Sequence, residues 1–237
     1  MPMPRPAFVA CLLALGCAGA GAANLQISPV SITFRAGQGA SGITLQNQGD
    51  TPVYGQVRAY AWTQRDGEDV LGETAELVAS PPIIEIAPRA AQTIRLILKA
   101  GSPTAVERSF RLLIDELPRA DGTQSGVDIR LRYSVPVFVP PAGDAAPVLA
   151  WRVFRQGGEW MLRVANTGAQ HAQLGSTTLR NGAGTEIIVS KGLLGYVLPG
   201  QERSWKLPVA QDAQLDGKVA VRSVVNARPE TADTAGR

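Results

Sequence analysis

The chain is a succession of short runs in which every second residue is apolar, and clusters rich in Gly, Asn, Asp and Pro separate these runs. Such alternation is typical of β-strands with one buried face, and no stretch after residue 24 has a helical period. The first half contains seven candidate strands, at residues 25–34, 42–48, 53–64, 82–87, 92–100, 108–117 and 128–139. The second half contains six, at residues 148–156, 159–167, 172–181, 186–195, 203–210 and 218–226.

The number and spacing of these runs predict an all-β chain of two immunoglobulin-like β-sandwich domains. We expect the first domain at residues 24–140 and a smaller second domain at residues 148–226. Residues 141–147 consist of Pro, Ala, Gly and Asp and are typical of a linker. Residues 227–237 contain few apolar side chains, so we expect a disordered tail.

The first 23 residues have the pattern of a secretory signal peptide. Arg5 supplies a positive charge, an apolar run extends from residue 7 to 16, and small residues lead to cleavage after Ala22 or Ala23. A lipoprotein-type site at Cys17 is the alternative, although Ala14 fits its leading position poorly. The apolar run is too short to anchor the chain in a bilayer, so we expect no stable membrane insertion.

The composition gives little support to catalysis. The two cysteines, Cys11 and Cys17, both lie in the signal peptide, and His171, the one histidine, is expected on the surface beside a turn. These residues cannot supply the usual zinc ligands or a cysteine nucleophile. We therefore predict that the protein is not an enzyme and has no metal or cofactor. The net charge of +3 is scattered, which argues against nucleic acid as a partner.

Residues 126–139, GVDIRLRYSVPVFV, predict a long strand whose two faces differ. One face carries only apolar residues, at Val127, Ile129, Leu131, Tyr133, Val135, Val137 and Val139. The other face carries Arg130 and Arg132. An apolar strand near a sheet edge can pair with another chain, and it favours self-association of the free protein.

Several motifs, in order over nearly the whole mature chain, resemble the PapD-like periplasmic chaperones of the chaperone–usher pilus pathway. They are LVASPPIIEIAPRAAQTIRLIL, ERSFRLLIDELP, RLRYSVPVFVPP, LRVANTGAQHAQL and LPGQERSWKLP. The motif RYSVPVFV is similar to the spore-coat-like or Csu-type branch. The resemblance implies an L-shaped (boomerang) pair of sandwiches in the periplasm. It also implies pilus or fimbrial subunits and an outer-membrane usher as partners.

The resemblance also implies roles for individual residues. Val127, Ile129, Leu131 and Tyr133 would form the donor strand that completes a subunit's sandwich. Arg95, Glu107 and Asp216 match the positions of an interdomain salt bridge. The family's two basic residues for a subunit's C-terminal carboxylate are missing, because Ser31 and Val135 or Pro136 stand in their places. Arg111, Arg130 and Arg132 are the substitutes that we expect to hold this carboxylate.

An exported two-domain immunoglobulin-like adhesin or carbohydrate-binding protein is the alternative. The fold alone would not separate it from a chaperone. An adhesin would display aromatic platforms on its loops, whereas the loops here are nearly free of aromatic residues. Trp62, Trp151, Trp160 and Trp205 all lie in expected strands and should pack in cores.

Overall fold

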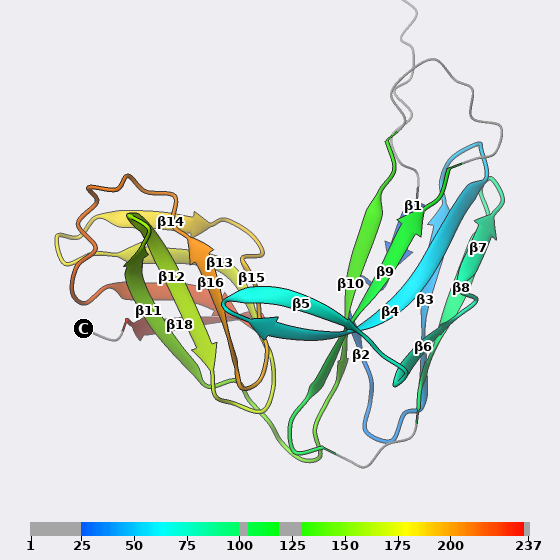
Figure 1. Cartoon of the computed structure of the whole chain (residues 1–237), viewed down its shortest axis with the longest axis horizontal. Helices are drawn as coiled ribbons and strands as arrows, with labels where there is room; N and C mark the ends of the chain where they lie inside the picture. Colours follow the sequence, from blue (N-terminus) through cyan, green and yellow to red (C-terminus); the bar gives the residue numbers. More distant parts are fainter. Residues whose placement is uncertain (1–24, 100–103, 119–128, 235–237) are drawn as a thin grey trace, which may run out of the picture.

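The computed structural model of the chain describes residues 25–99, 104–118 and 129–234. Strands are the only regular elements in these ranges, and none of the described segments is a long apolar helix suited to spanning a membrane. The signal peptide, both cysteines and Val127 lie outside the described residues. Figure 1 presents two β-lobes set at an angle to each other, as the expected L shape requires.

Two sheets form the first lobe. The first has the order β1-β3-β8-β6, with strands β1 (Leu25–Ser28), β3 (Ala40–Asn47), β8 (Ala91–Leu98) and β6 (Leu77–Ser80). The second has the order β2-β10-β9-β4-β5, with β7 also paired to β4, and its strands are β2 (Ile32–Thr33), β10 (Arg132–Val139), β9 (Arg108–Glu116), β4 (Val53–Arg65), β5 (Glu68–Glu73) and β7 (Ile83–Ile86).

Two smaller sheets form the second lobe. One has the order β11-β12-β16, with strands β11 (Leu149–Gln156), β12 (Glu159–Asn166) and β16 (Gln201–Lys206). The other has the order β14-β13-β17-β18, with β15 also paired to β13, and its strands are β14 (Glu186–Ser190), β13 (Ala172–Arg180), β17 (Ala220–Val225), β18 (Arg228–Asp233) and β15 (Gly195–Val197).

Each lobe has its own hydrophobic core, which the alternating residues of its strands fill. On β12, Trp160, Leu162 and Val164 are buried while the intervening residues are half-buried. On β10, Val135, Val137 and Val139 belong to the core of the first lobe, as the alternation predicts. Because the two cores share no residue, each lobe is a domain in the physical sense.

A buried asparagine organises the same turn in both domains, at Asn47 and at Asn166. The Nδ2 of Asn47 donates to the carbonyl oxygen four residues ahead at 2.8 Å and to one on another strand at 3.1 Å. Asn166 makes the corresponding two bonds at 2.8 and 3.1 Å. In each turn the asparagine Oδ1 also accepts a bond from the glycine two residues ahead. Such bonds from a side chain to the backbone stabilise a tight turn.

Several strands differ from the expectations drawn from the sequence: β5 and β6 were not expected, and the run at residues 25–34 is divided between β1 and β2. The tail expected to be disordered forms β18, which pairs with β17 through a turn in which Asn226 and Ala227 have positive φ. Because β18 is held by backbone pairing and buries little, its sequence carries no apolar alternation. The predicted strand over 128–139 begins at Arg132 in the described residues. Its partner β9 ends at Glu116, shortly before Pro118, so pairing stops there.

The β4–β5 hairpin of the first domain reaches across to the second domain, as Figure 1 shows. At its tip, the carbonyl oxygen of Gly67 accepts a hydrogen bond from Ser204 N of β16 at 3.0 Å and one from Arg203 Nη1 at 2.5 Å. A third cluster of buried residues lies at this junction and contains Trp62, Phe138, Tyr196 and Leu198. The two domains are thus joined by packed side chains and backbone bonds as well as by the linker.

Candidate functional site: an open strand edge and an arginine at the domain junction

One edge of β10 is open over half of its length. β9 pairs with β10 from Arg132 to Val139, whereas β2 covers the opposite edge only at Val137 and Phe138. In the part of the chain that the structure describes, no third strand pairs with β10. Backbone donors and acceptors between Arg132 and Val135 are therefore available to another strand.

Apolar side chains protrude beside this open edge. Ile129 is 71% exposed and Leu131 is 36% exposed. Tyr133 is half-buried and packs against the core of the first domain. Of the four residues predicted to form a donor strand, Tyr133 lies on β10, Ile129 and Leu131 lie in the segment just before it, and the fourth lies outside the described residues.

Arg111 lies in the middle of the six-stranded sheet, opposite Tyr60 of β4 and Pro136 of β10. Its neighbours on β9 point into the core, so Arg111 points out of the sheet toward the second domain. Its Cζ is 3.6 Å from the ring centroid of Trp62 and 5.3 Å from that of Tyr196. A guanidinium stacked in this way keeps the N–H groups at its edge free to bind a planar anion.

The charge of Arg111 is poorly compensated. Burial lowers the pKa of Arg111 below its ordinary value, and Asp69 and Tyr196 offset this only in part. Arg111 makes no ion pair with a described residue. Beside it, Trp62 Nε1 and Ser109 Oγ are buried polar atoms without a hydrogen-bond partner in the described structure. Ser109 shares a face of β9 with Arg111. These donors make the junction a suitable place for an acceptor such as a carboxylate.

Arg132 lies elsewhere on the sheet. Its Nε donates to Asp115, which also accepts a bond of 2.6 Å from Arg58 Nη2. Burial alone would raise the pKa of Asp115, but the hydrogen bonds from Arg132 and Arg58 hold it below its ordinary value. Arg132 lies opposite Asp115, and Pro136 lies opposite Arg111. Arg132 and Pro136 are four positions apart on β10, which is about 13 Å along a strand. Arg130 is exposed just before β10. The three arginines therefore do not converge on one point.

The residues expected to form an interdomain salt bridge also lie apart. Arg95 is exposed on β8 and makes no ion pair with the described residues, and Asp216 is exposed between β16 and β17. Glu107 does lie at the junction, and its Oε1 is 2.7 Å from Nδ1 of His171. His171, expected on the surface, is only 13% exposed at its side chain. Sequence reasoning missed this pair because nothing local to either residue indicates the other.

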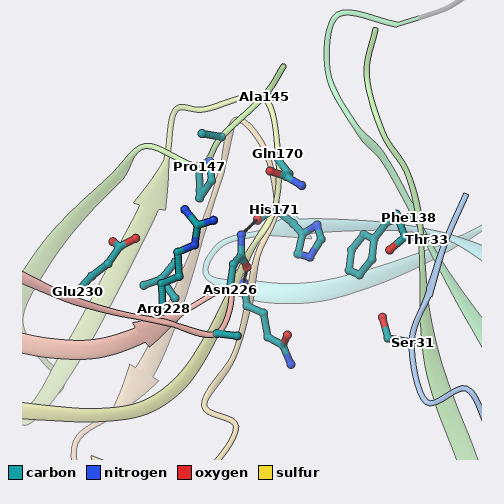
Figure 2. Close-up of a pocket in the computed structure, with 14 residues that line it drawn as sticks. Ser31, Thr33, Phe138, Ala145, Pro147, Gln170, His171, Asn226, Arg228 and Glu230 are labelled. Carbon is teal, nitrogen blue, oxygen red and sulfur yellow. Dashed lines mark hydrogen bonds between the residues drawn. The ribbon is translucent and has the colours of Figure 1, made fainter. Parts of the chain in front are cut away.

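A pocket of about 620 Å³ opens beside this pair, between the two domains. Ser31 and Thr33 line it from the first domain, Asn226 lines it from the turn between β17 and β18, and Arg228 lines it from the start of β18. Figure 2 shows the ring of His171 facing the ring of Phe138, with Asn226 bonded to the His171 backbone. Ser31, which replaces the expected arginine, therefore faces a polar pocket. Within the described ranges, no three acidic, histidine or cysteine residues are grouped as a metal site would require.

Comparisons with known proteins bear on the family of the chain. The sequence model for the PapD N-terminal domain of pili and flagellar-assembly chaperones matches residues 24–144, more than half of the 237 residues. The probable fimbrial chaperone YadV of Escherichia coli (strain K12) is 24% identical over 172 residues, which cover 67% of this chain and 68% of YadV.

Solved structures of the same kind superpose on nearly the whole chain. A chain of the CsuC–CsuE chaperone–tip adhesion subunit pre-assembly complex, from archaic chaperone-usher Csu pili of Acinetobacter baumannii, is 25% identical. It aligns with a TM-score of 0.69 over 90% of this chain and 99% of that one. The YadV chaperone structure aligns with a TM-score of 0.64 at 20% identity, over 89% of this chain and 99% of that one. With a family model that covers the first domain and a fold that matches over both, the chain belongs to the PapD-like pilus-assembly chaperones.

Proposed function

We propose that the mature chain is a periplasmic chaperone that stabilises pilus or fimbrial subunits by donor-strand complementation and delivers them to an outer-membrane usher. Residues 1–23 would direct its export. The protein would act as a binding partner without a cofactor, since its family consists of chaperones and not of enzymes. Related solved structures contain such partners, as in the complex of the SafA pilin with the SafB chaperone of Salmonella enterica.

The observation that carries the proposal is the open edge of β10 with exposed apolar residues beside it. An incomplete sandwich lacks a strand and exposes its core, which makes it prone to aggregate. A strand offered from outside supplies backbone hydrogen bonds, and its alternating side chains fill the exposed groove. Arg132–Val135 offer the free backbone, and Ile129 and Leu131 offer the side chains.

We also propose that Arg111 is the main anchor for the subunit's C-terminal carboxylate, with Arg130 and Arg132 in supporting roles nearer the open end. Arg111 is half-buried and makes no ion pair with a described residue, and Asp69 offsets the effect of its burial only in part, so a carboxylate would compensate its charge. Arg132 already pairs with Asp115, which it shares with Arg58, and its side chain is 62% exposed, so solvent and salt weaken its attraction for an anion other than Asp115.

The donor strand can be tested by co-expression with a pilus subunit from the same organism in a bacterial periplasm. We expect the Ile129→Asp/Leu131→Asp variant to lose the soluble subunit on co-purification, because two charges cannot enter an apolar groove. The matched control is Val78→Asp/Ile97→Asp, which changes two apolar residues that are each 39% exposed on the other sheet. Equal recovery with both variants would contradict the proposal. If folded wild type recovers no subunit, the adhesin alternative gains support.

The anchor can be tested by single replacements in the same assay. Removing one partner of a charge-assisted hydrogen bond costs about 1.5–3 kcal/mol, so we expect Arg111→Ala to weaken subunit binding roughly ten- to hundredfold. Arg130→Ala and Arg132→Ala should have smaller effects. Binding that is unchanged after all three arginines are replaced would exclude an anchor at these positions.

A further inference from the structure

We propose that Glu107 and His171 are positioning residues for Arg111, and that they act through a cluster of packed aromatic rings at the domain junction. This inference rests on the proposed function, because its effect is measured on the binding of a subunit's C-terminal carboxylate. It adds that a pair formed across the domain junction, Glu107 of the first domain and His171 of the second, controls how well the anchor works.

The first link joins the two domains by hydrogen bonds. Glu107 precedes β9, and its side chain is 1% exposed. Its Oε1 lies 2.7 Å from Nδ1 of His171 and accepts a bond of 3.2 Å from the His171 backbone N–H. The backbone N–H of Glu107 donates to Ala169 O at 3.0 Å. Three contacts on one residue fix the start of β13 against the start of β9, and so they fix the imidazole ring as well.

The second link is the packing of the His171 ring against a cluster of aromatic rings. The His171 ring lies 3.6 Å from the Phe138 ring, centroid to centroid, at an angle of 5° between their planes (Figure 2). Phe138 is 1% exposed and in turn lies 5.8 Å from Tyr196 and 6.0 Å from Trp62. Trp62 and Tyr196 meet edge to face at 5.4 Å. Rings this closely packed cannot move independently, because a displacement of one creates a void or a clash at the next.

The third link is the platform under Arg111. Trp62 belongs to β4 of the first domain and Tyr196 to β15 of the second, so the two rings that face the guanidinium come from different domains. Gln64 ties them together, since its Nε2 donates to Tyr196 O at 2.8 Å and its Oε1 accepts from Leu198 N at 3.0 Å. The platform therefore exists only at one arrangement of the domains, and Glu107 with His171 helps to hold that arrangement.

Three replacements at His171 separate the two contributions of its ring. His171→Phe keeps a ring that can stack on Phe138 but removes the side-chain bond to Glu107, whereas His171→Asn keeps a donor near Nδ1 but removes the ring. His171→Ala removes both. The probe is a synthetic peptide of a subunit's C-terminal strand, prepared either as the free carboxylate or as the C-terminal amide, and affinity is measured by calorimetry on the full mature protein.

The measured quantity is the ratio of affinities for the carboxylate and the amide. A merely structural role would weaken both peptides alike, but a positioning role lowers the ratio because only the carboxylate uses Arg111. We expect His171→Ala to lower this ratio about tenfold, and the Phe and Asn variants to lower it less. A ratio equal to that of wild type in all three variants would overturn the inference. Circular dichroism of each variant identifies any that fails to fold, and the remaining variants then decide.

A double-mutant cycle closes the test. We expect the ratio in Arg111→Ala to be low already and to be changed little by adding His171→Ala, since the histidine acts through the arginine. Independent, multiplying effects would count against the inference. The proposed function fails separately: in that case wild type itself does not distinguish the two peptides, whereas failure of this inference alone leaves wild type discriminating and the His171 variants unchanged.

Discussion

Gly168 is a residue at which the structure leaves no space for a side chain. A Cβ at this position would lie 2.6 Å from Val148 N and 2.8 Å from Pro147 C. Both are backbone atoms of the segment that enters the second domain, so they cannot rotate away. Asn166 Oδ1 accepts bonds of 3.0 Å from Val148 N and from Gly168 N, which draws the two segments together. The glycine is therefore required by a close approach of two backbones and not by its φ angle.

We expect Gly168→Ala to reduce the free energy of unfolding of the second domain by about 1–3 kcal/mol, the usual cost of overpacking. Gly182→Ala is the matched control, because a Cβ there meets nothing within 4 Å. Thermal denaturation of both variants measures the difference. Similar midpoints for the two would mean that the linker yields more easily than its hydrogen bonds suggest.

Single residues also mark where sequence reasoning stops. The turn at residues 166–168 could be predicted, since the ANTG pattern is a local signal. His171 was expected to be exposed, and this was wrong, because its burial depends on Phe138 and Glu107 from a different domain. Trp62 was expected in a core and is buried in one, but in the cluster at the junction and not in the core of either domain. A signal did exist for Trp62: β4 has 13 residues, more than one sandwich needs.

At the scale of the element, β10 packs one face in the core, as strands of a sandwich usually do, but leaves half of one edge unpaired. Alternation predicted that Val135, Val137 and Val139 face the core, and this is confirmed. The point at which pairing begins could not be predicted, because it depends on where the partner strand ends. Tyr133 lies at that boundary, and its hydroxyl contacts two other strands. It donates to Leu25 O of β1 at 3.3 Å and lies 3.4 Å from Glu116 Oε1 of β9.

Tyr133 gives β10 a measurable pH dependence. Burial, and then the negative charge of Glu116, raise the pKa of Tyr133 from 10.0 to about 12. Since the folded state keeps this proton to higher pH than the unfolded state, its contribution to stability is complete below pH 10 and is lost as the pH rises through about 12. We expect a spectrophotometric titration at 295 nm to include a late tyrosine that Tyr133→Phe removes. An unchanged titration curve for the variant would contradict this assignment.

At the scale of the whole molecule, the junction sets how the two sandwiches face each other. The existence of two sandwiches follows from the spacing of strands and turns. The contacts that join them could not be derived in the same way, since the Gly67 tip and residues 203–204 are far apart in sequence. Of the expected salt-bridge residues only Glu107 lies at the junction, because Arg95 is on the sheet that faces away from it.

Replacing Gly67 should change the angle between the domains more than their stability. A Cβ on Gly67 would lie 2.7 Å from Ser204 Oγ and 2.9 Å from Ser204 Cβ, and its φ of +78° is strained for alanine. We expect small-angle X-ray scattering to report an altered domain arrangement in Gly67→Ala. Gly72→Ala, in the same hairpin but with nothing within 4 Å of a Cβ, should scatter like wild type. Identical curves for both variants would show that the hairpin tip does not fix the angle.

Because β2 pairs with β10 near one end only, the open edge of β10 could distinguish bound strands by their length. β2 pairs with β10 only at Val137 and Phe138, next to Pro136, which lies opposite Arg111. Distances along the open edge are therefore counted from this end. Ile129 lies seven positions before Pro136, and this corresponds to about 23 Å along an extended chain. A guest strand whose terminal carboxylate sits at Arg111 would have its apolar side chains compared with Leu131 and Ile129 at set distances from its end. The edge would then select a guest by the spacing between its C-terminus and its hydrophobic residues. A guest of the same composition but with a different spacing would fit less well.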